Sequence, residues 1–460
     1  MATDMKKRIL FVHYRVGERD GVSLEIEKRA KIFQELGEEV YFLSGYDGKK
    51  RKNSFVIKEL DITSNLNRFL KECFFNKKKK VLDELTAMML FFKLENVIHK
   101  KLNKAVKIIN PDLIFVHNVF SHAYNLPFSS ALLKVLDKME IPTVCVHHDF
   151  WFERDEFLKP NYYFINEIVN LFPPKRNFII KHQVINSIML NIIKQKRGIA
   201  AEKIGDYFDF KNQYQSKNTE IEIRNFFSIN EKDLVVLHAT RITPRKAIEN
   251  AIYFVYELEK KMKRLTPLKI NTNKRNFIFD KDSRVILFLP NFVEFDSRDY
   301  FHRLNKLAFQ LKVKCYFAYE HFSLENNLKK GKKSTFNFFD SYLIADLVTY
   351  TSIKEGFGNQ FLEAVFFKKP VVLFEYPVFE SDIKKEGYEI ISIGNTVKAF
   401  NGFKLVPKEK IKEAVDLTID ILKDKEKYQM MVEKNFELAK KFHDESFLKK
   451  DLSLLLKNAL

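Results

Sequence analysis

The chain has 460 residues, of which 46% are hydrophobic and 30% charged; this excludes a disordered or fibrous chain and leaves room for two globular domains. Its formal net charge of +19 would attract polyanions, but the basic residues are dispersed and the longest run is Lys77 to Lys80. We therefore expect a solvated basic surface and do not expect nucleic acid as a partner. Three separate cysteines without a Cys-x-x-Cys spacing exclude a thiolate zinc site and give no hint of a disulfide framework.

Neither a secretory leader nor a membrane span is predicted. The first apolar stretch, after Lys7, is too short for a signal peptide, and no run approaches the length that crosses a bilayer. We expect a cytoplasmic protein, at most peripheral at the inner face of the membrane.

The first part of the chain predicts alternating strands and helices. A helix with apolar positions at steps of three and four begins near Val22 and ends at a Gly37 cap. Mainly helical sequence is expected between Asn65 and Asn110, and again from about Asn161 to Gly198. Strands are expected at Arg8–His13, Val40–Ser44, Asp112–Val116, Pro142–Val146 and Lys203–Gly205. This βαβ alternation is typical of a parallel sheet.

The alternation restarts after a polar, charged stretch from Lys211 to Asn225, which we expect to be a linker. Two further helices are predicted from about Lys408 to the end. Strands are expected at Leu234–Ala239, Val285–Leu289, Lys314–Ala318, Leu347–Thr351, Val371–Phe374 and Glu389–Ser392. We thus expect an α/β protein with an N-terminal domain (1–205), a linker (206–230), a second domain (231–407) and C-terminal helices (408–460) that pack back on the N-terminal domain. In such sheets ligands bind beyond the carboxyl ends of the strands, so the cleft between the domains is the expected site.

The run Tyr350 to Ala364 (YTSIKEGFGNQFLEA) predicts a strand, a glycine-containing turn and a helix that begins near Asn359. A helix N-terminus presents unpaired N–H groups and a partial positive charge, which suit a diphosphate. Glu355 and Glu363 bracket the turn and would repel a diphosphate, so we expect them to bind neutral hydroxyls. The alternative is a loop with two ordinary surface acids.

Basic residues follow the strand expected at Leu234–Ala239. Arg241 and Lys246 are expected in the loop at the carboxyl end of that strand, where two cations can neutralise a diphosphate as its charge grows. The alternative is a solvated basic loop.

Two loops of the first domain carry further candidates. His147 and His148 follow a strand and should point in opposite directions, so at most one faces the cleft. No third ligand is spaced nearby for a metal. Gly21 lies in the loop from Gly17 to Val22 that opens the first helix and could touch donor or acceptor; a simple turn is the alternative.

Together these motifs resemble the family-four retaining glycosyltransferases of the GT-B fold, which have two Rossmann-like domains facing each other across a cleft. That family carries a Glu-x7-Glu element, matched here from Glu355 to Glu363, and an Arg followed five residues later by a Lys, matched by Arg241 and Lys246. His148 and Gly21 match its N-domain histidine and first-loop glycine. The resemblance covers nearly the whole chain, in the same order. It departs from the family at Ala247 and Asp20, where the family usually has glycine.

The resemblance implies roles for these residues. Glu355 would bind hydroxyls of the donor sugar, Glu363 the ribose, and Arg241 and Lys246 the diphosphate, while His148 would orient the sugar. The implied catalytic residues are His148, Glu355, Arg241 and Lys246. The implied donor-binding residues are Gly21, Arg241, Lys246, Glu355, Gly356, Phe357, Gly358, Asn359, Gln360, Phe361 and Glu363. Such enzymes need no metal, so we expect no cofactor; the single Asp-x-Asp, from Asp280 to Asp282, is expected to be a turn.

The implied function is transfer of glucose or mannose from a nucleotide sugar, such as UDP-glucose or GDP-mannose, with retained configuration. The acceptor would be a hydroxyl of a sugar, a sugar acid, a phosphorylated sugar or a glycolipid. The alternatives are a nucleotide-sugar epimerase of the same fold, and a non-catalytic basic scaffold that binds membrane or nucleic acid. The stretch from Asn65 to Lys107, with its lysine run, is expected either to guide the acceptor or to contact an anionic membrane.

Overall fold

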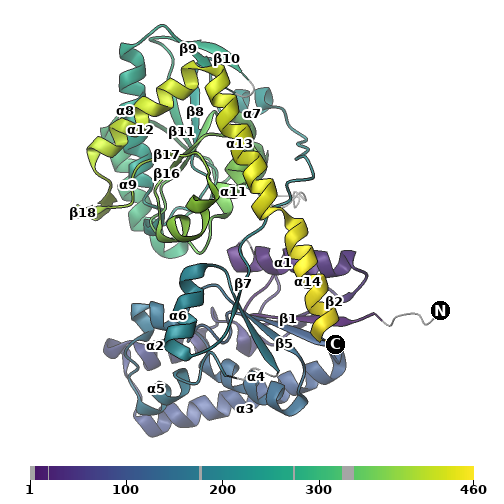
Figure 1. The fold of residues 1–460 in the computed structure, drawn as a ribbon. Helices are drawn as coiled ribbons and strands as arrows, with labels where there is room; N and C mark the ends of the chain where they lie inside the picture. The colour runs from purple at the N-terminus through teal and green to yellow at the C-terminus, as the bar shows by residue number, and fades with distance from the viewer. Residues whose placement is uncertain (1–5, 19, 176–178, 273–274, 324–335, 460) are drawn as a thin grey trace, which may run out of the picture. The chain divides into compact units, whose positions relative to one another are not determined.

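A computed structural model describes residues 6–18, 20–175, 179–272, 275–323 and 336–459 of the chain (Figure 1). The chain divides into two compact units. The first comprises Met1–Gly205 and Ser446–Leu460, and the second Asp206–Glu445. Each unit is built on a parallel sheet with helices between successive strands, which agrees with the α/β architecture expected from the sequence.

The first unit contains a seven-stranded parallel sheet in the order β3-β2-β1-β4-β5-β6-β7. The order reverses at β1, which pairs with both β2 and β4. Its strands are β1 (Arg8–Val12), β2 (Glu39–Ser44), β3 (Ser54–Val56), β4 (Leu113–His117), β5 (Thr143–His147), β6 (Ile180–Val184) and β7 (Glu202–Lys203). The central strands β1, β4 and β5 are buried almost throughout, which explains their continuous apolar sequence.

Helices cover both faces of this sheet (Figure 1). On one face, Leu10 and Val12 pack into a core with residues of α3 and α4. On the other face, the ring of Phe33 from α1 lies 5.5 Å from that of Phe115. The helices of this unit are α1 (Gly21–Glu35), α2 (Asn65–Phe75), α3 (Glu84–Ile109), α4 (Leu126–Met139), α5 (Tyr163–Val169), α6 (Ser187–Arg197) and α14 (Glu445–Ala459).

The prediction of helical structure from residue 161 to 198 is wrong for the middle of this segment. Between α5 and α6 the chain forms strand β6, which pairs with β5 along its length. Its sequence, IKHQV, contains two polar residues that the sheet buries, His182 and Gln183. Local sequence favours a helix here only weakly, and the strand is fixed by its neighbour in the sheet.

The second unit contains a six-stranded parallel sheet in the order β12-β11-β8-β15-β16-β17. Strands β8 and β15 are neighbours at its centre, so the loops that follow them leave the same edge of the sheet. The strands are β8 (Leu234–Leu237), β11 (Val285–Leu289), β12 (Lys314–Phe317), β15 (Leu347–Tyr350), β16 (Val371–Leu373) and β17 (Ile391–Ser392). All six match predicted strands, to within one or two residues at the ends.

Short strand pairs outside this sheet had no counterpart in the sequence analysis. They are β9 (Leu268–Asn271) with β10 (Asn276–Phe279), β13 (Phe322–Ser323) with β14 (Phe336–Asn337), and β18 (Lys398–Phe400) with β19 (Phe403–Leu405). The helices of the unit are α7 (Glu220–Phe226), α8 (Ile248–Arg264), α9 (Arg298–Gln310), α10 (Ser341–Ile344), α11 (Asn359–Phe366), α12 (Lys408–Lys423) and α13 (Lys425–His443).

Two expectations about helices differ from the structure. The stretch from Lys211 to Asn225, expected to be a linker, contains most of helix α7, whose Thr219 and Glu222 form a capping box. The end of the chain, expected to form two helices, forms three: α12, α13 and α14. The break between α12 and α13 lies at Asp424, whose side chain accepts hydrogen bonds from the first turn of α13.

Candidate functional site

The glycine turn between β15 and α11 is built around Gly358. A Cβ atom at this position would lie 2.5 Å from the hydroxyl oxygen of Tyr376, which donates a 2.6 Å hydrogen bond to the carbonyl of Phe357. The φ angle of Gly358 is 164°, which is extended backbone, so the need for glycine is steric. No side chain caps the first turn of α11, and its N–H groups are therefore suited to an anion.

Glu355, in the same turn, is buried against two cations from the loop after β8. Its Oε1 accepts a hydrogen bond from Nζ of Lys246, and its Oε2 lies 3.1 Å from Nη1 of Arg245. Burial alone would raise the pKa of Glu355, but Lys246 and Arg245 outweigh it and lower the pKa to about 2. The carboxylate is therefore ionised at neutral pH.

Lys246 ends a single helical turn that precedes α8, from Pro244 to Lys246, and only 3% of the residue is exposed. The hydroxyl of Thr351 donates to the carbonyl oxygens of Lys246 (2.9 Å) and Ala247 (3.0 Å), which fixes this loop against the end of β15. Burial lowers the pKa of Lys246 to about 8, although Glu355 opposes the shift. The ammonium group is therefore charged at pH 7 but titrates well below an exposed lysine.

The family's glycine after the lysine is replaced by Ala247, and the structure shows what that position demands. Ala247 adopts the left-handed conformation, with φ of 44°, and is fully buried. A non-glycine residue in this conformation costs about 1–2 kcal/mol, which the loop tolerates here.

Arg241 does not contact Glu355. Its guanidinium Nη1 lies 2.8 Å from a carboxylate oxygen of Glu294, and the side chain is partly exposed. It is nevertheless close enough that its charge contributes to the lowered pKa of Lys246. The structure thus joins Lys246 to Glu355 directly and adds Arg245, a residue that the sequence analysis passed over. The position of Arg245 next to Lys246, in a loop between a strand and a helix, was the signal by which the sequence could have identified it.

Glu363, the second glutamate of the motif, has a different environment. It lies on the buried face of α11, and its Oε2 accepts a 2.7 Å hydrogen bond from the hydroxyl of Tyr342 in α10. The two glutamates therefore have different partners in the ligand-free chain. Glu355 is paired with two cations, whereas Glu363 accepts a hydrogen bond from a buried tyrosine hydroxyl.

His148 lies just beyond β5 in the first unit. Its backbone N–H donates to Oδ1 of Asn118 at 2.8 Å, and its ring stacks against His117 at 5.8 Å between centroids. Burial lowers the pKa of His148 to about 4, although Glu25 opposes the shift, so the ring is neutral at pH 7. His147 has a different partner, since its Nε2 lies 2.9 Å from Nδ1 of His182. The two adjacent histidines diverge as predicted.

Gly21 is the first residue of α1. The carboxylate of Asp20 accepts hydrogen bonds from Val22 (3.0 Å) and Ser23 (3.1 Å) and so caps the helix. This cap gives a physical reason for aspartate where the family usually has glycine. A Cβ atom at Gly21 would meet nothing within 4 Å, so packing inside the unit does not require glycine there. Residue 19 of this loop lies outside the described residues.

In the described parts of the chain, no three His, Cys, Asp or Glu side chains are grouped so that they could hold a metal ion. In the single Asp-x-Asp, Asp280 accepts hydrogen bonds from the backbone of Asp282 and Ser283, both at 3.1 Å. It is therefore the organiser of a turn. No helix within the described ranges has the length and hydropathy to cross a bilayer.

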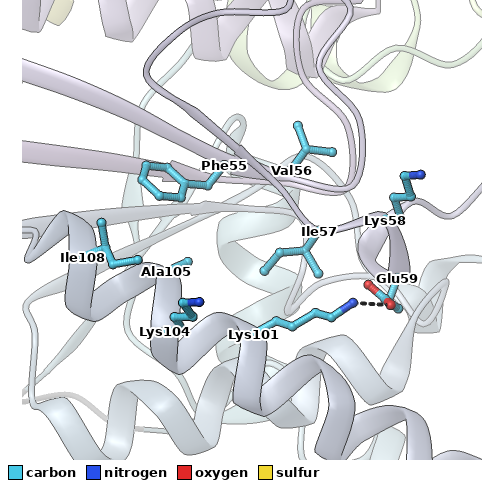
Figure 2. A pocket seen from close by; sticks show the side chains of 9 residues that line it. All are labelled: Phe55, Val56, Ile57, Lys58, Glu59, Lys101, Lys104, Ala105 and Ile108. Atoms are coloured by element: carbon cyan, nitrogen blue, oxygen red, sulfur yellow. Dashed lines mark hydrogen bonds and ion pairs between the residues drawn. The ribbon is translucent and has the colours of Figure 1, made fainter.

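A shallow groove of about 440 Å³ lies on the first unit, between the edge strand β3 and helix α3 (Figure 2). Its lysine Lys101 forms a 2.5 Å ion pair with Glu59. None of the predicted site residues lines it, and its lining contains no glycine. The lining residues are Phe55, Val56, Ile57, Lys58, Glu59, Lys101, Lys104, Ala105 and Ile108.

Comparison with known proteins identifies relatives along nearly the whole chain. Residues 316–438 match the family described as Glycosyl transferases group 1. The chain is 35% identical to mannosylglucosylglycerate synthase of Petrotoga mobilis over 415 residues, covering 90% of this chain and 93% of that protein. It is 33% identical to the synthase of the same name from Thermotoga maritima over 434 residues, covering 94% and 96%.

Solved structures support the same conclusion at the level of fold. The crystal structure of HepE from Anabaena, in complex with UDP, superposes with a TM-score of 0.57 at 16% identity and covers 98% of this chain and 100% of that one. The predicted GT-B class is confirmed, and so is the prediction of an enzyme that transfers a glycosyl group. The chain is a glycosyltransferase of the family that includes the two mannosylglucosylglycerate synthases.

Proposed function

We propose that this glycosyltransferase moves a mannosyl group from a nucleotide diphosphate mannose to a hydroxyl of a sugar-acid acceptor of the glucosylglycerate type. The names of the two relatives support this substrate pair, because both describe a product with mannose, glucose and glycerate parts. Among the donors considered, GDP-mannose is the one that carries mannose; UDP-glucose is the alternative donor.

The observation that carries the proposal is the buried group of Lys246, Arg245 and Glu355 beside the uncapped start of α11. Lys246, with Arg241 at the edge of the loop, would neutralise the diphosphate together with the first N–H groups of α11. Glu355 is ionised and buried, and would accept hydrogen bonds from the sugar hydroxyls.

The chemical step needs no protein nucleophile. The bond from the sugar C1 to the diphosphate oxygen breaks, and a bond from C1 to the acceptor oxygen forms on the same face. The leaving phosphate oxygen takes the acceptor proton. The protein's part is to stabilise the charge that develops on the leaving diphosphate, which a fixed lysine and helix amides do without reorganisation. In this scheme a neutral His148 would orient the sugar by hydrogen bonding and would not carry charge.

The test is an assay of the purified chain with a donor panel of UDP, GDP and ADP sugars that includes GDP-mannose and UDP-glucose. Each donor is tested with glucosylglycerate, with glycerate and without an acceptor. We expect mannosyl transfer to glucosylglycerate. Conversion of a donor to its epimer without acceptor would support the epimerase alternative instead. Absence of transfer from every donor would contradict the proposal.

Peripheral contact with an anionic membrane is a second proposal, supported by the outer face of α3. The inner face of this helix, with Phe91 and Ile98, packs into the core. The outer face exposes Leu85, Met89 and Phe92, one helical turn apart from each other, close in sequence to the lysine turn Lys77–Lys79. Flotation with anionic and neutral vesicles tests it: we expect salt-sensitive binding to anionic vesicles that Leu85→Gln and Met89→Gln together remove. Equal binding to anionic and to neutral vesicles would contradict contact with an anionic membrane.

A further inference from the structure

Lys246 has two competing partners if the function proposed above is right. In the ligand-free chain its ammonium group is held by Glu355. In the donor complex it would face the diphosphate. A buried carboxylate that loses its cation is strongly destabilised unless other donors replace it.

Two hydroxyl groups beside Glu355 are uncommitted. The Oη of Tyr350 and the Oγ of Ser352 are buried and have no hydrogen-bond partner. Tyr350 is 1% exposed and Ser352 fully buried, so water does not satisfy these groups from bulk solvent. A buried hydroxyl without a partner costs folding free energy, and its persistence calls for a functional explanation.

Both hydroxyls belong to the surroundings of the carboxylate. The charge on Glu355 contributes to the raised pKa of Tyr350, and the hydroxyl of Ser352 contributes to the lowered pKa of Glu355. Lys246 Nζ lies 5.9 Å from the centre of the Tyr350 ring, so the lysine, the phenol and the carboxylate form one cluster.

Neighbouring hydroxyls of the same cluster are already engaged. Thr351 donates to the carbonyl oxygens of Lys246 and Ala247, and Tyr376 donates to the carbonyl of Phe357. Their bonds hold the loops in place. Tyr350 and Ser352, on either side of Thr351, are left with hydroxyls that can turn toward Glu355.

We propose that Tyr350 and Ser352 are positioning residues that take over the carboxylate of Glu355 when Lys246 turns to the donor diphosphate. Their hydroxyl groups then donate to Glu355, and Arg245 stays on its second oxygen. Glu355 thus remains ionised in the donor complex and can accept hydrogen bonds from the sugar. The exchange makes the site specific for a ligand that has both a diphosphate and a sugar. The diphosphate must bind Lys246 before the carboxylate of Glu355 can accept hydrogen bonds from the sugar hydroxyls.

The titratable groups that face Glu355 come from three parts of the unit. They are Lys246 and Arg245 before α8, His238 at the end of β8, and Tyr350 and Tyr376 at the ends of β15 and β16. Burial lowers the pKa of His238 to about 3. His238 and Glu355 therefore keep their protonation states above about pH 4 in the free chain, and an acid limb above that pH in the donor complex reports Glu355 without its lysine.

The pH dependence of kcat and kcat/KM tests the exchange, because kcat/KM reports groups of the free enzyme and kcat reports those of the donor complex. The variants are Tyr350→Phe, Ser352→Ala and the double variant. In the free enzyme Lys246 still holds Glu355, so the acid side of kcat/KM should move by less than that of kcat. In the complex the acid limb of kcat should move upward by about 1 pH unit in the double variant.

Tyr388→Phe is the matched control. It removes another buried hydroxyl without a partner from the same unit, but one that does not lie beside Glu355. Its two profiles should equal those of wild type. The proposal is overturned if the acid limbs of kcat and kcat/KM move by the same amount in the double variant, if neither moves, or if Tyr388→Phe gives the same shift.

Binding calorimetry with GDP and UDP in buffers of different ionisation enthalpy gives a second readout that needs no turnover. At pH 5 the double variant should take up more protons than wild type when it binds the nucleotide, because Glu355 loses its cation without replacement. Equal proton uptake would overturn the exchange while leaving the proposed function intact. If wild type bound neither nucleotide and transferred no sugar, the proposed function would fail and this inference with it.

Discussion

Lys246 and Glu355 are 109 positions apart in the chain, yet the ammonium group of one donates directly to the buried carboxylate of the other. They meet because β8 and β15 are adjacent in the sheet and the loops that follow both strands leave the same edge. The ion pair favours the charged form of both groups. It outweighs burial for Glu355, whose pKa falls to about 2, but burial outweighs it for Lys246, whose pKa falls to about 8.

Acid stability should depend on Glu355. Its pKa falls from an ordinary 4.5 to about 2 in the folded chain, so the stabilisation is complete above pH 4.5 and is lost as pH falls toward 2. The full span corresponds to about 3 kcal/mol. In urea unfolding, the difference between wild type and Glu355→Gln should shrink over this interval. Glu409→Gln, at an exposed position of α12, is the control and should show no such change.

Donor binding should weaken above about pH 8, where the buried Lys246 loses its proton. We expect kcat/KM to fall on the alkaline side with an apparent pKa near this value. Lys246→Arg keeps the charge at every accessible pH, because a guanidinium does not titrate there. Its activity will be lower, but the alkaline limb should disappear. An alkaline limb unchanged in this variant would assign the titration to another group.

Gly358→Ala should distort the turn before α11, because the new Cβ would lie 2.5 Å from the hydroxyl oxygen of Tyr376. We expect a loss of about 1–3 kcal/mol of stability and weaker nucleotide binding. Adding Tyr376→Phe removes the clashing oxygen and should restore part of both. Gly21→Ala, where a Cβ meets nothing, is the control and should change stability by less than about 0.5 kcal/mol. A double variant no better than Gly358→Ala would contradict the steric explanation.

Arg241→Ala should lower kcat/KM by about 100-fold, in line with the loss of one charge that stabilises the leaving diphosphate. Because Arg241 also pairs with Glu294, the variant Glu294→Ala separates the two roles. If the ion pair itself mattered, both variants would lose activity equally. Steady-state kinetics that show near wild-type turnover for Arg241→Ala would remove it from the diphosphate site.

Transfer should survive metal removal and should retain the donor's anomeric configuration. In the proposed mechanism Lys246, Arg241 and the start of α11 would supply the positive charge that a metal provides in other transferases. Activity in EDTA and NMR of the first-formed product check both points. A strict need for Mn²⁺, or an inverted product, would contradict the proposed mechanism.

The sequence by itself predicted most of the fold. Runs such as Val285–Leu289 are continuously apolar because an interior strand of a parallel sheet is buried on both faces, and that pattern needs no partner to be recognised. It also located the turn before α11, since glycine is required there for space. It failed at β6, where the buried residues include His182 and Gln183, and only pairing with β5 makes the segment a strand.

The tertiary structure alone decided which side chains meet. The sequence predicted Arg241 and Lys246 as equivalent cations of one loop. In the structure Lys246 forms an ion pair with Glu355, whereas Arg241 forms one with Glu294. Burial then set the charge states, because the pKa of Lys246 or Glu355 depends on desolvation and on neighbours that lie far away in the chain. Local sequence encodes secondary structure and turns; distances between loops, and therefore electrostatics, arise only when the strands align in the sheet.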